Sequence, residues 1–405
     1  MSPRIVILAD DLSGAADCAS ACRRAGMKAT VCLEAQALVS SADALALDLN
    51  SRDLPPAEAR ARTLALPGPS VGATLYRKID STLRGHVALD IAATLQLAGP
   101  GAFAIVCPAY PATGRTVRGG CVYVDGQRLA DTEIWALGGR GSTSIMTLLA
   151  EAGLAPAALG LETIRGPDLR HALEAARAGG ARAAVCDAET DADLDAIVAA
   201  GLAMSGMVWA GSGGLTIPLA RALSPGGAPE SEPVTRRLGP ILVAVGSASS
   251  ISREQLERLT ADARVRPLTI RPQALLDGPD GSGWRPASRG IVAAVGRPGQ
   301  DTVAVAIDAE TPADPALRPA LAAAFGLMVG RQLGRFGALV VTGGETARAV
   351  LSAAGVRALE VRGELEPGVV LSMAGALPVV TKAGAFGEPD SLVGAVEALR
   401  RLPLA

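Results

Sequence analysis

The sequence predicts two doubly wound α/β domains with a ligand cleft between them. Short, wholly apolar runs alternate with helical patterns, as at residues 5–8 and 102–107, and such runs are typical of parallel strands buried on both faces. A length of 405 residues suits two domains of ordinary size. A polar stretch with proline and glycine and no periodicity separates two such series. We therefore expect a first domain over residues 1–225, a linker over 226–239 and a second domain over 240–405.

The composition limits the class of protein and its partners. Apolar residues make up 49% of the chain and aromatic residues only 2%, so the cores must be built from Ala, Val and Leu. A net charge of -2, without a basic stripe, argues against nucleic acid as a partner. No apolar run reaches the roughly 18 residues of a membrane span, and no secretory signal is recognisable, so we expect a cytoplasmic protein. The six cysteines lack zinc-site spacing and are expected to be buried free thiols.

In the first domain, strand and helix patterns alternate almost throughout. A helix is expected from about residue 12 to 25, with Asp11 or Ser13 as its N-cap and Gly26 as its end. The expected strands that follow are 29–33, 44–49, 71–76, 102–107, 159–164, 181–186 and 207–210. A hairpin is expected over 117–124, and helices over 87–97, 142–152, 167–178 and 191–202, with a further helix opened by Pro55-Pro56 and one ending near residue 223.

The most informative stretch is residues 77–86, Arg-Lys-Ile-Asp-Ser-Thr-Leu-Arg-Gly-His. It lies between an expected strand and an expected helix, at the carboxyl edge of the sheet, where such sheets bind ligands. Two cations, a carboxylate and two hydroxyls fall close together there. The alternative is a simple helix start capped by Ser81 or Thr82.

Lysine usage makes this stretch more specific. The chain is rich in arginine but has only three lysines, Lys28, Lys78 and Lys382. An ammonium is a compact charge suited to phosphate or carboxylate. Lys78 is therefore expected to have a chemical role.

Other polar side chains also follow predicted strands. Asp10 and Asp11 come directly after the first strand, and Arg52 lies in the turn after the third. Arg115 follows a strand through a segment rich in Pro and Gly that cannot be regular helix. Gly211 to Gly214 could face a ligand, although glycine loops between strand and helix are common.

In the second domain three strands end in glycine-rich turns. Strand 241–245 leads into Gly-Ser-Ala-Ser, strand 338–341 into Thr-Gly-Gly-Glu-Thr, and strand 378–381 into Lys-Ala-Gly-Ala-Phe-Gly. Backbone N–H groups at such helix starts can bind phosphate, although each loop could also be a plain tight turn. Neither a Walker A motif nor an intact G-x-G-x-x-G at a strand-to-helix turn is present. A helix is expected over 315–335 and a surface loop over 277–288.

These motifs resemble, in order, those of the four-carbon acid sugar kinases. Residues 9–15 are similar to A-D-D-L-T-G-A, and residues 78–85 match K-I-D-S-T-L-R-G throughout. Pro-Ala-Tyr-Pro at 108–111, with Gly114-Arg115-Thr116 and Gly119, is a further match. In the second half, 246–249 is similar to G-S-C-S, 343–346 to G-G-[DE]-T and 382–387 to K-[SA]-G-G-F-G. The resemblance covers nearly the whole chain.

The resemblance implies a sugar-acid-binding first domain, a nucleotide-binding second domain and ATP as phosphoryl donor. The expected reaction is phosphorylation of a hydroxyl of threonate, erythronate or a 3-oxo-tetronate. The expected catalytic residues are Asp80, Asp11 and Lys78, with either aspartate as the base. The substrate would be bound by Asp10, Asp11, Arg52, Lys78, Asp80, Ser81, Arg84 and Arg115. The nucleotide would lie on Ser247, Ser249, Gly343, Gly344, Glu345, Thr346, Lys382 and Gly384, with Mg²⁺ bridging its phosphates; the protein ligands of the metal are left open.

The sequence departs from the family motifs at three places, and two other functions are considered. Ala248 and Ala385 replace a usual cysteine and glycine, and residues 134–142 lack the usual Asp-Pro, which leaves the particular acid open. A non-catalytic regulator that binds a sugar acid and a nucleotide is the main alternative, and ATP turnover would distinguish the two. A dehydrogenase is disfavoured because no dinucleotide fingerprint follows the first strand. The sequence also leaves a homo-oligomer open.

Overall fold

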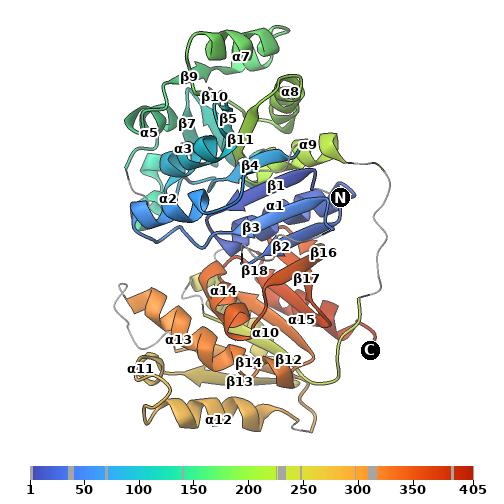
Figure 1. The fold of residues 1–405 in the computed structure, drawn as a ribbon. Coiled ribbons are helices and arrows are strands. Elements are labelled where there is room, and N and C mark those ends of the chain that lie inside the picture. Colours follow the sequence, from blue (N-terminus) through green and yellow to red (C-terminus); the bar gives the residue numbers. More distant parts are fainter. Residues whose placement is uncertain are drawn as a thin grey trace. The chain divides into compact units, whose positions relative to one another are not determined.

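The computed structural model groups the chain into two compact units (Figure 1). One unit comprises Met1–Thr30 and Leu38–Pro229, and the other comprises Val31–Ala37 and Glu230–Ala405. The structure describes residues 3–34, 41–68, 72–138, 141–224, 226, 234–246, 249–296, 298–308, 317–384 and 387–404. The chain thus passes between the units near β2 (Ala29–Cys32) and again after residue 229.

The first unit is built on a parallel sheet with the strand order β3-β1-β4-β11-β5-β10-β9. The register pairs Ala9 with Asp48 and with Lys78, Lys78 with Gly211, and Gly211 with Cys107. The loops after these strands therefore leave the sheet at one edge, which is why residues far apart in sequence can meet there. The strands are β1 (Ile5–Ala9), β3 (Ala44–Asp48), β4 (Thr74–Lys78), β5 (Phe103–Cys107), β9 (Pro156–Leu159), β10 (Ala183–Cys186) and β11 (Met207–Gly211).

The helices of this unit mostly follow the predicted pattern. Asp11 caps α1 by accepting from the N–H of Gly14, as expected. Helix α3 begins one residue after His86, so Ser81 and Thr82 do not cap it. The helices are α1 (Leu12–Arg24), α2 (Pro56–Leu64), α3 (Val87–Ala98), α4 (Glu133–Gly138), α5 (Ile145–Glu151), α6 (Leu161–Ile164), α7 (Leu169–Ala178), α8 (Asp191–Leu202) and α9 (Gly213–Leu223).

Two further features of the first unit concern predicted elements. The predicted hairpin forms, as β6 (Arg115–Arg118) and β7 (Cys121–Val124), and β8 (Gln127–Arg128) extends it to a small antiparallel sheet. The predicted strand 159–164 is wrong: the strand ends at Leu159 and residues 161–164 form a helical turn instead. All six cysteines are free, and five of them are buried.

The second unit contains a mixed sheet with the strand order β13-β14-β12-β15-β18-β17-β16. Its first five strands are parallel, but β17 pairs antiparallel with both β18 and β16, and this antiparallel part of the sheet was not predicted. The register pairs Val245 with Thr342 and Thr342 with Lys382, so the three glycine-rich turns start at the same edge. The strands are β12 (Ile241–Val245), β13 (Val265–Ile270), β14 (Thr302–Ile307), β15 (Ala338–Thr342), β16 (Ala358–Glu366), β17 (Val369–Ala374) and β18 (Leu377–Lys382).

Small residues let the helices of this unit pack closely without aromatic side chains. A Cβ on Gly326 of α13 would lie 2.3 Å from the Cβ of Ala349 on α14. The predicted loop 277–288 is wrong in its second half, because α12 starts at Trp284, which is buried. The helices are α10 (Ser250–Thr260), α11 (Pro272–Leu276), α12 (Trp284–Ala294), α13 (Arg318–Gly330), α14 (Gly344–Ala353) and α15 (Ser391–Arg400).

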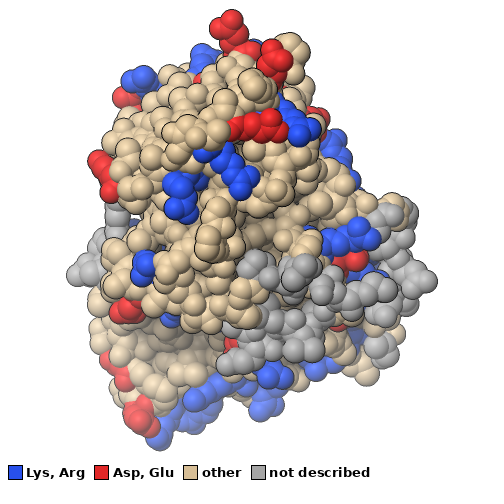
Figure 2. Space-filling view, turned by 45° about the horizontal axis from the view of Figure 1, so that its top comes forward, with Lys and Arg blue, Asp and Glu red and all other residues tan. Residues whose placement is uncertain are grey.

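The surface carries both signs of charge. Lys and Arg side chains and Asp and Glu side chains both occur across the face in Figure 2, in keeping with a net charge of -2. Within the part of the chain that the structure describes, we find no helix with the length and apolar character needed to cross a membrane.

Candidate active site

At the carboxyl edge of the first sheet, one arginine joins two aspartates. Arg52 Nε and Nη2 lie 2.7 and 2.8 Å from the two carboxylate oxygens of Asp10, and Nη1 lies 2.7 Å from Asp11 Oδ2. Arg52 Nη2 is also 3.8 Å from Asp80 Oδ2. Asp10 is buried, and this burial acts to raise its pKa. The charge and hydrogen bonds of Arg52, together with the charges of Lys78 and Arg77, outweigh the burial and hold the pKa of Asp10 below its usual range. Arg52 is therefore already engaged by the protein's own carboxylates.

Asp80 is held on both of its oxygens. Oδ1 accepts from the N–H of Thr82 at 2.8 Å and from the hydroxyl of the same residue, and Oδ2 lies 2.6 Å from Arg84 Nη2. Burial acts to raise the pKa of Asp80, but Arg84 and Arg52 outweigh it and keep that pKa far below its usual range. Asp80 is therefore an ionised structural anchor of the turn.

The turn itself is conformationally constrained. Leu83 has a φ of 58° and Gly85 one of 85°, and Leu83 is buried although its backbone lies in the left-handed region. Non-glycine residues held in this region cost free energy and cluster at functional sites. Ser81 lies in the turn directly after Asp80 and is half-buried.

Lys78, the last residue of β4, points onto the first turn of α1. A Cβ on Gly14 would lie 2.8 Å from Lys78 Nζ and 2.8 Å from Asp11 Oδ1, so only glycine allows this approach. Burial acts to lower the pKa of Lys78, but the negative groups nearby, among them Asp11 and Asp80, outweigh it and raise that pKa. Lys78 is thus a buried cation beside Asp11.

One residue of this region, Asp17, was missed in the sequence. Asp17 of α1 contributes to the field around Lys78, and its carboxylate lies where a Cβ on Gly213 would be, 2.0 Å from that position. A Cβ on Gly214 would lie 2.4 Å from the carbonyl oxygen of Ala109. The glycines after β11 therefore allow close packing of α1 and the loop after β5, and only their position after a strand could have indicated this.

The fourth cation predicted for the acid site is placed differently. Arg115 begins β6, and its guanidinium donates to the carbonyl of Thr113 within the same loop. Arg115 thus contacts its own loop. The structure brings together the other predicted charged residues, Asp10, Asp11, Arg52, Lys78, Asp80 and Arg84. Three cations and three carboxylates balance in this group, and Arg84 is its most exposed cation, with 41% of its side chain accessible.

In the second unit the glycine-rich turns contact one another. A Cβ on Gly246 would lie 2.2 Å from the hydroxyl oxygen of Thr346, which is buried at the start of α14. Gly343 has a φ of 90° and its N–H donates to the carbonyl of Lys382 at 2.8 Å. Gly344 and Glu345 form the first turn of α14.

Hydroxyls tie the third turn to the first. The carbonyl of Gly384 accepts from Ser249 Oγ at 2.8 Å and from Ser252 Oγ at 2.7 Å, and Ser249 caps α10. Burial lowers the pKa of Lys382 to about 8, although Glu366 opposes this shift. Ser247 lies outside the described residues. The two helix starts, α10 and α14, thus border a group of loops that carries glycine, hydroxyls and one lysine.

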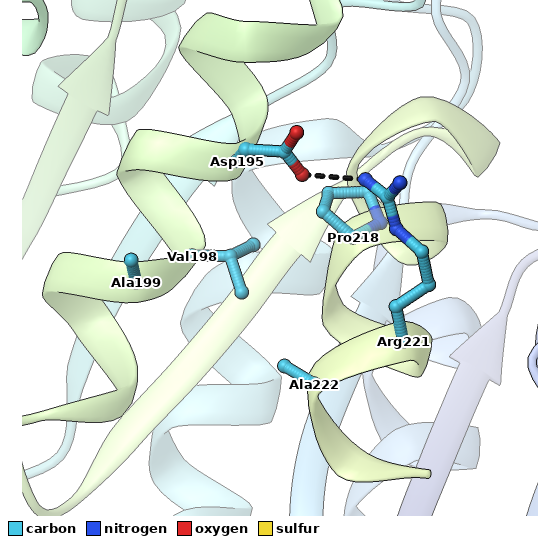
Figure 3. Close-up of a pocket in the computed structure, with 6 residues that line it drawn as sticks. All are labelled: Asp195, Val198, Ala199, Pro218, Arg221 and Ala222. Atoms are coloured by element: carbon cyan, nitrogen blue, oxygen red, sulfur yellow. Dashed lines mark hydrogen bonds and ion pairs between the residues drawn. The ribbon is translucent and has the colours of Figure 1, made fainter. Parts of the chain in front are cut away.

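A hollow on the first unit does not mark another active site. A hollow of about 330 Å³ lies between α8 and the second half of α9, where Asp195 and Arg221 form an exposed ion pair of 2.5 Å (Figure 3). It lies away from the strand ends and holds no further charged side chain, so we do not assign the chemistry to it. In the described ranges no three His, Cys, Asp or Glu side chains are grouped so as to hold a metal ion.

Family models and known proteins match this arrangement. Residues 5–219 match the sugar-binding N-terminal domain and residues 242–392 the nucleotide-binding C-terminal domain. The chain is 43% identical to a D-threonate kinase of Cupriavidus necator, over 97% of both chains. It is 35% identical to a D-threonate kinase of Bordetella bronchiseptica, over 98% of both. It is 30% identical to a 3-oxo-tetronate kinase of Burkholderia multivorans, over 98% of this chain and 97% of the relative.

Solved structures share the fold. A protein from Salmonella typhimurium LT2 has a TM-score of 0.78 at 20% identity and covers 98% of this chain and 99% of its own. A Haemophilus influenzae protein of the family DUF1537 has a TM-score of 0.73 at 22% identity, and the match covers 98% of this chain and 100% of the other. The two family models and the full-length relatives confirm the resemblance that the motifs predicted: the chain belongs to the four-carbon acid sugar kinase family, with a sugar-binding N-terminal and a nucleotide-binding C-terminal domain.

Proposed function

We propose that this protein is an ATP-dependent kinase that phosphorylates a hydroxyl of a four-carbon sugar acid, with D-threonate as the acceptor. The observation that carries the proposal is the identity of 43% to a D-threonate kinase over 97% of both chains. The charged group at the carboxyl edge of the first sheet supports it, since a small acid with several hydroxyls needs both cations and carboxylates for recognition.

The cations divide into two roles. Arg52 is hydrogen-bonded to Asp10 and Asp11, so it orients the carboxylates that accept from the sugar hydroxyls. These bonds leave it fewer N–H groups to donate to the carboxylate of the substrate. Arg84 is partly exposed, and Lys78 is a buried cation close to Asp11. We assign the carboxylate of the substrate to Arg84 and Lys78, with Arg115 as an additional contact.

Between the two candidate bases, the geometry favours Asp11. A base must accept a proton from the attacking hydroxyl, but Asp80 is saturated by Thr82 and Arg84 and its pKa lies far below the usual range. Asp11 accepts from the N–H of Gly14 and from Arg52, and 21% of its side chain is accessible. Asp11 is therefore proposed as the base, and Asp80 as the residue that holds Arg84 and the turn.

The loops of the second unit fit a nucleotide. The N–H groups at the starts of α10 and α14 can bind phosphate, and Gly246, Gly343 and Gly384 keep the backbone free of side chains there. Magnesium requires oxygen ligands and commonly keeps waters and phosphates, so Glu345 and Thr346 suit it and a cluster of carboxylates is not needed. When bound, the ion would neutralise charge on the phosphates. Lys382 would bind the phosphates as a cation.

The test is ADP release with ATP and Mg²⁺ against D- and L-threonate, D- and L-erythronate, 3-oxo-tetronates and the matching aldoses. We expect turnover with acids only and the highest kcat/KM with D-threonate. Asp11→Asn should lower kcat by about 10² to 10⁴, the usual contribution of a positioned base. The control is Asp195→Asn, on the exposed ion pair of Figure 3, which should keep the activity of the wild type.

Three outcomes would contradict parts of this proposal. Turnover of neutral aldoses would remove the role of the cations. A kcat close to that of the wild type for Asp11→Asn would return the choice of base to Asp80. Binding of acid and nucleotide without turnover would favour the regulator.

A further inference from the structure

A histidine next to the central turn contacts the loop that carries Arg52. His86 Nε2 lies 2.7 Å from the carbonyl oxygen of Leu54, so the ring nitrogen donates to that carbonyl. Leu54 is two residues from Arg52. The bond thus joins the end of the turn at residues 79–86 to the loop at residues 50–54.

The same loop is bonded to the first strand end. The N–H groups of Ser51 and Arg52 donate to the carbonyl of Asp10 at 2.9 and 3.3 Å. The Arg52 side chain then closes on both carboxylate oxygens of Asp10. The loop is therefore held by Asp10 at one end and by His86 at the other.

Gly85 brings the turn at residues 79–86 into close contact with Asp10 and Arg52. A Cβ on Gly85 would lie 2.7 Å from Asp10 Oδ2 and 3.5 Å from Arg52 Cγ, and Gly85 has a φ of 85°. Glycine is the residue that adopts this backbone conformation and allows the approach at no steric cost. The ring of His86 can then reach over to Leu54.

We infer that His86 is a positioning residue of the acceptor site, which fixes the loop at 50–54 so that Arg52 orients Asp10 and Asp11. It acts through Arg52 and does not contact the substrate. This inference rests on the proposed function for its kinetic readout, but not for its structural one.

The chain offers both a conservative variant and a matched control. His86→Gln keeps an N–H donor at a similar distance from the backbone, whereas His86→Leu removes the donor and keeps much of the volume. His171, the other histidine of the chain, is exposed on α7, so His171→Leu is the control.

The kinetic test uses the acid that the wild type phosphorylates best. His86→Leu should raise the KM for the acid roughly three- to tenfold, as expected for one lost hydrogen bond, and leave the KM for ATP unchanged. His86→Gln should stay within about twofold of the wild type, as should His171→Leu. Equal effects of Leu and Gln, or equal shifts of both KM values, would overturn the inference.

The structural test does not need turnover. Hydrogen exchange of the Ser51 and Arg52 amides, followed on the full chain, should be faster in His86→Leu and close to the wild type in His86→Gln. Unchanged exchange in His86→Leu would overturn the inference even where the enzyme is active. If instead no acid is turned over by the wild type but exchange responds as expected, the proposed function fails and the positioning role stands.

Discussion

The two candidate binding regions of this molecule are built from different chemistry. In the first unit, charged side chains bond one another: Arg52 with Asp10 and Asp11, and Arg84 with Asp80. In the second unit, the loops are joined by hydroxyls and backbone groups, as at the carbonyl of Gly384. A charge removed from the first region leaves its partner buried and unpaired, whereas a change in the second region alters mainly shape.

This difference follows what each region is proposed to recognise. A small acid must be distinguished from neutral sugars, which requires charges, and charges in a buried site must be balanced. A phosphate chain can be bound by N–H groups at helix starts, which need close approach more than charge. The substitutions below test the comparison, starting with the largest expected effect.

The largest effect is expected for Arg52→Met. It leaves Asp10 and Asp11 without the guanidinium that bonds to both, in a site where 17% of the arginine side chain is accessible. Breaking such a buried pair costs about 3–5 kcal/mol, so the free energy of unfolding should fall by that order at pH 7 and kcat/KM for the acid by about 100-fold or more. Arg60→Met, on the exposed face of α2, is the control.

The pH dependence of this loss has a definite sign. The pKa of Asp10 in the folded protein is held below its usual value. The ionised Asp10 therefore stabilises the folded state at any pH above that usual pKa, and this stabilisation is lost as the pH falls through the pKa of the folded state. The difference in unfolding free energy between wild type and Arg52→Met, measured with urea, should therefore shrink in acid. A difference that stays constant down to the acid limit would contradict the ion-pair explanation.

A smaller effect is expected for Gly246→Ala in the second unit. The added Cβ would lie 2.2 Å from Thr346 Oγ1, and Thr346 is buried, so the two turns must move apart. Overpacking of this kind costs about 1–3 kcal/mol, and we expect the KM for ATP to rise about tenfold while the KM for the acid is unchanged. In Gly290→Ala, where a Cβ meets nothing within 4 Å, both KM values should stay as in the wild type. Equal changes in the KM for ATP and in the KM for the acid would contradict a specific role of the glycine-rich turns in nucleotide binding.

Much of the fold and of the first site could be predicted from sequence, because both depend on local patterns. Wholly apolar strands ending in polar residues located Asp10, Asp11, Lys78 and Asp80 at one sheet edge. Their partners could not be predicted, since the choice among three cations and three carboxylates depends on which strands are neighbours.

The elements and contacts that were not predicted have different causes. The hairpin of β16 and β17 turns at Pro367-Gly368, where Gly368 has a φ of 78°, and this dipeptide is a turn signal that could have indicated the hairpin. The helical turn at 161–164 replaces a predicted strand because the apolar residues there are too few to separate a helical period from a strand period. The bond from His86 to Leu54 joins residues 32 apart through a backbone carbonyl, for which no sequence pattern exists.

At pH 7 the smallest effect is expected at Lys382, because its contribution changes only as the pH rises. Burial lowers the pKa of Lys382 to about 8, so its ammonium is largely charged at pH 7 and loses its proton as the pH rises through 8. If it binds the phosphates, kcat/KM for ATP should be almost constant below pH 8 and fall up to about tenfold per pH unit above it. Lys382→Arg, which keeps its charge, should remove this fall, whereas Lys28→Arg, at an exposed lysine, should keep it.

The stability of the protein should change in the opposite sense, which separates binding from folding. Because the pKa of Lys382 is lower in the folded state, the unfolded chain binds more protons between about pH 8 and its usual 10.5, and the free energy of unfolding gains from this group as the pH rises through that window. A fall in kcat/KM that accompanies a gain in stability cannot come from unfolding. A pH profile of kcat/KM that is the same in Lys382→Arg and the wild type would exclude Lys382 from phosphate binding and would leave the second region as a cradle formed by its backbone and hydroxyl groups alone.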